Sequence, residues 1–91
     1  MPSEASAKEG GLHYVYLLRS RADPRQRYVG VTSDLPARLK AHNAGESPHT
    51  SKFRTWGLVT YLAFSHRLQA EEFERYLKSG SGHAFANKRL W

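Results

Sequence analysis

The sequence predicts a small domain of mixed α/β content, of the α+β class in which strands and helices are segregated. Three segments have strand composition: residues 12–19, 27–32 and 56–65. A turn-rich stretch, residues 21–26, joins the first two, and so short a connection favours an antiparallel hairpin. Capped helical patterns follow the second and third strands. Residues 12–91 are therefore expected to form one domain.

The first strand has two different faces. Tyr14, Tyr16 and Leu18 fall on one face and Val15 and Leu17 on the other, because side chains alternate along a strand. The third strand is almost continuously apolar, which predicts a central place in the sheet or cover on both faces.

The helix predicted over residues 35–43 has clear start and stop signals. Asp34 is a suitable N-cap, and Pro36 lies in the first turn, where its missing N–H costs nothing. Gly45 is expected to end the helix, and Leu39 is expected to lie on its buried face.

Two more helices are predicted, over residues 67–79 and 84–90. Ala70, Phe73 and Leu77 form the core face of the first of them. The Ser-Gly-Ser-Gly segment between the helices has two compatible interpretations. It is a helix stop at Gly80 followed by a Ser81 N-cap for the last helix, or a set of N–H groups that holds a phosphate.

Positive charge is in excess over the whole chain. Its 91 residues include 14 Lys+Arg against 8 Asp+Glu, a formal charge of +6. Such a surplus favours a polyanionic partner, most often nucleic acid, although some small proteins are simply basic. The absence of cysteine excludes disulfides, thiol nucleophiles and cysteine zinc sites.

No segment predicts membrane contact or secretion. No apolar run approaches the ~20 residues that span a bilayer, and residues 1–11 lack the apolar stretch of a secretory signal. We therefore expect a cytoplasmic protein. Residues 1–11 have too little apolar surface to offset their ordering entropy, which predicts a disordered tail.

Tyr16 and Tyr28 are candidate catalytic residues on adjacent strands. A buried strand tyrosine usually packs with its hydroxyl bonded to the backbone, and this interpretation stays open for each. A phenol with an ordinary pKa near ~10 is a poor base at neutral pH. Catalysis would need a nearby cation or metal-bound water to favour the phenolate.

Arg38 and His42 lie about one turn apart on the same face of a helix. A guanidinium offers planar, bidentate donors to a phosphoryl oxygen, and an imidazole can relay a proton near pH 7. Asp34, four residues before Arg38, leaves open the alternative of a surface ion pair.

Glu74 is the candidate metal ligand. Its carboxylate is a hard oxygen donor of the kind that Mg²⁺ takes together with waters and substrate phosphate. An ion pair with Lys78, four residues on, is the alternative. Glu71 and Glu72 are expected to be solvated.

These residues have the order and spacing of a known family. Over residues 12–91 the chain resembles the GIY-YIG nuclease superfamily, and within it the small single-domain bacterial proteins. Residues 14–16, Tyr-Val-Tyr, correspond to GIY, the first of the two motifs in the family's name, and Tyr14 stands where glycine is usual. Residues 28–30, Tyr-Val-Gly, stand at the second. Residues 30–42 resemble the block that follows, and residues 70–78 the metal-binding helix.

The resemblance implies a three-stranded antiparallel sheet flanked by helices. It also implies a metal-dependent endonuclease that hydrolyses DNA phosphodiester bonds with a single Mg²⁺ or Mn²⁺, in repair, recombination or mobile-element processing. Tyr16 would be the general base, relayed by His42, and Tyr28 would orient the water or the metal's hydration shell. Arg38 would stabilise the phosphorane charge, and Glu74 would ligate the metal. Which tyrosine acts as the base stays open.

Four further residues are candidate substrate contacts: Lys52, Lys78, His83 and Asn87. Asn87 stands for an asparagine that the family often has after the glutamate. Since larger members add DNA-binding domains or partners, we expect weak specificity here, or specificity from a protein partner or an unusual DNA structure. A non-catalytic nucleic-acid-binding module and a small interaction protein remain alternatives.

Overall fold

The structure is a computed structural model that describes residues 11–91, so the predicted tail lies, apart from Gly11, outside the described residues. The elements in chain order are β1 (His13–Ser20), β2 (Arg27–Thr32), α2 (Leu35–Asn43), a 3₁₀ turn η1 (Ser51–Phe53), β3 (Trp56–Phe64), α3 (Arg67–Leu77) and α4 (Gly80–Arg89). Within residues 11–91, every helix is too short or too polar to cross a membrane.

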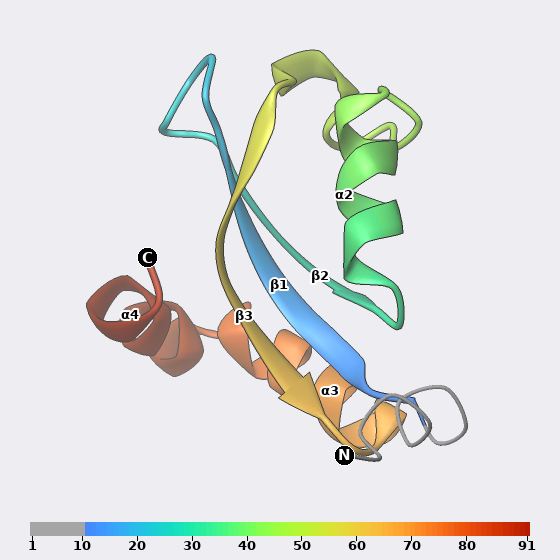
Figure 1. The fold of residues 1–91 in the computed structure, drawn as a ribbon. Coiled ribbons are helices and arrows are strands. Elements are labelled where there is room, and N and C mark those ends of the chain that lie inside the picture. Colours follow the sequence, from blue (N-terminus) through green and yellow to red (C-terminus); the bar gives the residue numbers. More distant parts are fainter. Residues whose placement is uncertain (1–10) are drawn as a thin grey trace.

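The three strands form one antiparallel sheet in the order β2-β1-β3, which confirms the predicted architecture (Figure 1). The expectation that the third strand is central or covered is wrong. β3 is an edge strand, and its Leu58 and Tyr61 are 38% and 52% exposed. β1 takes the centre because it pairs with both neighbours, and its residues Val15 to Leu18 are buried on both faces. Much of the apolar content of β3 therefore forms surface.

Different helices cover the two faces of the sheet (Figure 1). On one face, Tyr16 and Leu18 pack with Leu35 of α2. On the other face, Val15 and Leu17 pack with apolar residues of α3 and α4. We call these the α2 face and the α3/α4 face. The alternation predicted for the first strand thus separates two cores.

The first helix begins and ends as its sequence predicts. The Asp34 carboxylate accepts a hydrogen bond from the backbone N–H of Ala37 at 3.2 Å, and Pro36 lies in the first turn. Gly45 follows the helix with a φ of +81°, a left-handed conformation that favours glycine.

The last helix begins earlier than predicted. α4 starts at Gly80, and the Ser79 hydroxyl, in place of the predicted Ser81, caps it by accepting from the N–H of Gly82 at 3.3 Å. The Ser-Gly-Ser-Gly segment is thus the first turn of a helix, which its low helix propensity concealed. Gly82 is buried, and a Cβ there would collide with the backbone carbonyl of Tyr76. Glycine therefore permits the close packing of α3 and α4.

Candidate active site

Tyr16 lies at the centre of the middle strand and points to the α2 face, where it is 1% exposed. Leu18 and Trp56 pack in the same cluster. The ring of Tyr28, from β2, lies 6.1 Å from the Tyr16 ring between centroids, and the imidazole of His42, from α2, lies 5.7 Å away. The hairpin and the helix thus bring together three of the residues predicted for catalysis.

A hydrogen-bonded chain runs from Tyr16 into the protein interior. The Tyr16 hydroxyl lies 2.9 Å from Nε2 of His42, and Nδ1 of His42 lies 2.7 Å from Oγ1 of Thr50. His42 and Thr50 are fully buried. The indole N–H of Trp56 donates to the Thr50 carbonyl at 2.7 Å, which fixes the loop that carries the hydroxyl. Phenol, imidazole and hydroxyl therefore form one connected polar group inside an aromatic cluster.

Burial sets the charge state of this chain. Burial raises the pKa of the Tyr16 phenol well above its usual range, Tyr28 raises it further, and the charge of Arg38 opposes the shift. Burial, and secondly the charge of Arg38, lowers the pKa of the His42 imidazole. Both groups are therefore neutral at pH 7. One nitrogen of a neutral imidazole donates and the other accepts, so Tyr16 and Thr50 take opposite hydrogen-bonding roles.

Gly30 provides the space that the Tyr16 hydroxyl occupies. The two residues are directly opposite each other in the β1–β2 pair. A Cβ on residue 30 would lie 2.5 Å from the Tyr16 hydroxyl oxygen and 2.9 Å from the Tyr28 ring. The glycine of the second motif is therefore required by the close approach of the two phenol rings.

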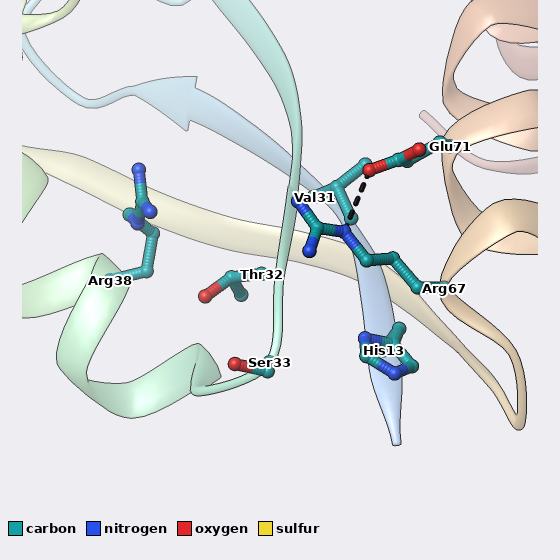
Figure 2. A pocket seen from close by; sticks show the side chains of 7 residues that line it. All are labelled: His13, Val31, Thr32, Ser33, Arg38, Arg67 and Glu71. Carbon is teal, nitrogen blue, oxygen red and sulfur yellow. Dashed lines mark hydrogen bonds and ion pairs between the residues drawn. The ribbon is translucent and has the colours of Figure 1, made fainter. Parts of the chain in front are cut away.

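Arg38 is exposed on α2 and lines a pocket of about 280 Å³ where β2 ends (Figure 2). The lining residues are His13, Val31, Thr32, Ser33, Arg38, Arg67 and Glu71. The charge of Arg38 acts on the pKa values of both Tyr16 and His42, which places it within electrostatic reach of the buried chain. Among the ion pairs of residues 11–91 there is none between Asp34 and Arg38.

Glu74 lies on α3 and forms the alternative ion pair with Lys78. Its side chain is 20% exposed, whereas that of Lys78 is 56% exposed. Helical spacing puts Glu74 on the same face of α3 as Arg67 and Glu71, which line the pocket beside β2. The negative charge of Glu74 also makes a small upward contribution to the pKa of Tyr16. α2 and α3 thus bring charges of opposite sign toward the same phenol.

The residues of this site fit one hard metal ion better than a multi-ligand metal centre. In the described part of the chain, no three His, Cys, Asp or Glu side chains are grouped as metal ligands. Mg²⁺ needs no such cage, because it keeps most of its waters and takes one or two carboxylates plus substrate phosphate. The partly exposed carboxylate of Glu74 is a donor of this kind.

The four candidate substrate contacts lie in different places. Lys52 is exposed on η1, and His83 is exposed on α4. The side-chain oxygen of Asn87 accepts a hydrogen bond from the Arg27 guanidinium at 2.9 Å. Within residues 11–91, neither these three residues nor Lys78 is hydrogen-bonded to the chain of Tyr16, His42 and Thr50.

Two features of the site were not predicted from the sequence. Thr50 was not among the predicted site residues, although a buried histidine needs a partner for each ring nitrogen. Glu71, expected to be solvated, forms an exposed ion pair with Arg67 at 2.9 Å and also lines the pocket. Its spacing of three residues from Glu74, on one helix face, was the available signal.

Comparison with protein families matches residues 12–88 to the GIY-YIG catalytic domain. The chain is 34% identical over 83 residues to the structure-specific endonuclease subunit SLX1 of Candida dubliniensis, covering 84% of this chain and 28% of that protein. It is 32% identical over 84 residues to the SLX1 protein of Meyerozyma guilliermondii, again covering 28% of that protein. The chain thus spans little more than a quarter of these relatives.

Small proteins are also similar along most of their length. A UPF0213 protein of Haloquadratum walsbyi is 35% identical over 68 residues, which cover 74% of each chain. The solution NMR structure of a UPF0213 protein from Bacillus halodurans superposes with a TM-score of 0.51 at 26% identity, covering 87% of this chain and 86% of that one. The resemblance predicted from the two tyrosine motifs is confirmed.

Proposed function

This chain belongs to the GIY-YIG family, and from that premise we propose that it is a divalent-metal-dependent endonuclease that hydrolyses phosphodiester bonds of DNA. The observation that carries the proposal is the buried chain from Tyr16 through His42 to Thr50, with Arg38 and Glu74 acting on its phenol from two helices. A phenol that only packs in a core needs neither a buried imidazole partner nor opposite charges beside it.

Tyr16 is the general base in this proposal. Its oxygen takes a proton from the attacking water while its own proton passes to Nε2 of His42, 2.9 Å away. A free phenolate, which the raised pKa of Tyr16 disfavours, is then never formed. Thr50 accepts from the Nδ1–H of His42 and holds the ring in position. The negative charge of the bound phosphate favours the imidazolium that results.

Arg38 and Tyr28 complete the protein side of the reaction. Arg38 donates to the phosphate oxygens and stabilises the charge that develops on them, an effect worth about 10²–10³ in rate for one donor. Tyr28, half-buried beside Tyr16, orients the attacking water or the metal's hydration shell. Tyr16 is assigned as the base because its hydroxyl, of the two, bonds to His42.

Glu74 would hold a single Mg²⁺ or Mn²⁺. When bound, such an ion polarises the phosphate and supplies positive charge opposite the developing oxyanion. Glu74 is paired with Lys78 in this structure, so coordination of an ion by Glu74 would replace that pair. Lys78 would then be available to a DNA phosphate.

DNA is the proposed partner because the chain carries a formal charge of +6 and phosphate contacts dominate such interactions. Lys52, His83 and Asn87 are further proposed contacts. Relatives named as subunits of a structure-specific endonuclease support two more proposals. These are recognition of DNA structure in repair, recombination or mobile-element processing, and a protein partner that confers specificity.

Non-catalytic nucleic-acid binding is the second candidate function. The ion pair between Glu74 and Lys78 favours it, because a carboxylate that only stabilises a helix would form the same pair. Under this alternative the protein binds DNA but leaves it intact with every metal.

Cleavage assays separate the two candidates. Supercoiled, linear, branched and single-stranded DNA are incubated with Mg²⁺, Mn²⁺ or EDTA, using the wild-type protein and the variants Tyr16→Phe, Glu74→Gln and Glu72→Gln. Glu72 is an exposed carboxylate on the same helix and serves as the matched control. We expect metal-dependent cleavage by wild type and Glu72→Gln only. Cleavage by Glu74→Gln at the wild-type rate would contradict the single-metal assignment.

A further inference from the structure

The pocket where β2 ends contains an arginine that the proposed catalytic mechanism does not use. Arg67 reaches from α3 toward β2 on one side, and Arg38 stands on α2 on the other side (Figure 2). His13, at the start of β1, and Ser33, directly after β2, lie beside them. The pocket therefore combines two guanidinium groups with an imidazole and a hydroxyl, all of which can donate to an anion.

The electrostatics of this pocket favour an anion in addition to Glu71. Arg67 contacts Glu71 through Nε at 2.9 Å, and its guanidinium carries four more N–H groups on the two terminal nitrogens. The Arg67 side chain is 76% exposed, so a ligand from solvent can reach it. Two guanidinium groups face one carboxylate, which leaves the lining with a net positive charge.

We propose that this pocket is a second phosphate subsite, which binds the phosphate adjacent to the cleaved one on the same DNA strand. The inference rests on the proposed function, in which Arg38 binds the scissile phosphate. A strand carries one phosphate per ~3.4 Å of duplex axis. Arg67 lies across the same pocket from Arg38, so it is the guanidinium available to the phosphate next to the one that Arg38 binds.

Glu71 acts in this proposal as a counter-ion that the phosphate displaces. It holds the Arg67 side chain over the pocket before DNA binds, and it competes with the phosphate for the guanidinium. Removal of the Arg67 charge should therefore weaken DNA binding, whereas removal of the Glu71 charge should strengthen it. A second metal ligand at Glu71 would instead be revealed by loss of metal-dependent cleavage in Glu71→Gln.

The test measures binding of a labelled DNA strand by wild type and by Arg67→Gln, in EDTA so that cleavage does not interfere. Arg25→Gln is the matched control: Arg25 pairs through Nε with Asp23 at 3.0 Å, but in the β1–β2 connection, at the other end of β1 from His13. At about 0.1 M salt we expect Arg67→Gln to lose about tenfold in affinity and Arg25→Gln less than twofold. The slope of the logarithm of the binding constant against the logarithm of the salt concentration should become shallower by ~0.7–0.9 for Arg67→Gln and stay unchanged for Arg25→Gln.

Two further arms locate the contact. Glu71→Gln should bind DNA more tightly than wild type and should still cleave it. A strand with an uncharged methylphosphonate next to the mapped cleavage position should bind wild type about tenfold more weakly, and Arg67→Gln with little further loss. Inorganic phosphate, added as competitor, should weaken wild-type binding more than binding by Arg67→Gln.

The outcomes distinguish the subsite from the proposed function. Equal losses of DNA affinity in Arg67→Gln and Arg25→Gln would overturn the subsite, and so would loss of cleavage in Glu71→Gln. Cleavage by the wild-type protein would still support the nuclease proposal. If wild type binds DNA but never cleaves it, and Arg67→Gln alone binds weakly, the pocket is a phosphate-binding site but the nuclease proposal fails.

Discussion

The two faces of the sheet are built from alternate residues of one strand, yet they bury different chemistry. On the α3/α4 face, Val15 and Leu17 pack against hydrocarbon side chains. On the α2 face, Tyr16 is as deeply buried but bonds to a buried imidazole. Burial of hydrocarbon side chains stabilises a fold without creating unsatisfied polar groups. A buried polar chain lowers the stability unless every polar group in it is hydrogen-bonded. The comparison indicates that the buried residues of β1 on one face maintain the fold, whereas those on the other face form the polar chain of the proposed reaction.

The sharpest test of this division substitutes neighbours on β1. Tyr16→Phe should lower the cleavage rate about 10²–10⁴-fold, because it removes the proposed proton acceptor. Leu17→Ala should lower the free energy of unfolding by about 2–5 kcal/mol, with little change in rate per folded molecule. Single-turnover cleavage and urea denaturation measure the two effects. If both variants lost the same rate per folded molecule, the faces would not be functionally distinct.

Two glycines provide a second comparison, because each permits a close approach on one face. Gly82→Ala should cost about 3 kcal/mol, since the new Cβ meets the backbone of α3, which cannot move aside easily. Gly30→Ala meets the hydroxyl end of Tyr16 and the ring of Tyr28, which are side-chain atoms rather than backbone. It should cost about 1–2 kcal/mol in stability but at least about tenfold in cleavage. Thermal unfolding and initial rates, compared for both variants, check the pair.

Thr50 tests whether the buried chain is a relay or only a packing arrangement. Thr50→Val keeps the shape but leaves Nδ1 of His42 without its partner, which should cost about 1–3 kcal/mol of stability. Cleavage should fall about tenfold and its pH profile should shift. Thr50→Ser, which retains the hydroxyl, should restore the wild-type profile. A pH profile unchanged in Thr50→Val would exclude Thr50 from the relay.

The smallest expected effect is the pH dependence of stability. The pKa of His42 is lowered in the folded protein, so the unfolded chain takes up a proton first as the pH falls below about 6.5, and stability declines. The raised pKa of Tyr16 makes stability decline above pH ~10, where the unfolded phenol ionises first. Chemical denaturation of Leu17→Ala should show the decline in stability at both low and high pH, with a lower free energy of unfolding throughout. In Tyr16→Phe the decline in stability at high pH should be weaker.

Local patterns in the sequence predicted much of this molecule. Asp34, Pro36 and Gly45 set the ends of α2 through short-range rules of capping and backbone geometry. The alternation along β1 predicted the two faces, and the order of the tyrosine motifs predicted the family. Such features need no knowledge of distant residues, because alternation and capping act over a few positions.

Only the tertiary structure decided the rest. The sequence predicted Tyr16 and His42 as site residues. Thr50 joins their hydrogen-bonded chain because the loop after α2 brings its buried hydroxyl to Nδ1 of His42. β3 became an edge strand because β1 uses both of its edges for pairing. The pocket of Arg38, Arg67 and Glu71 arises where two helices flank one strand. No periodic signal links Tyr16 to His42 or Arg38 to Arg67, because the fold alone sets the distance between residues so far apart in sequence.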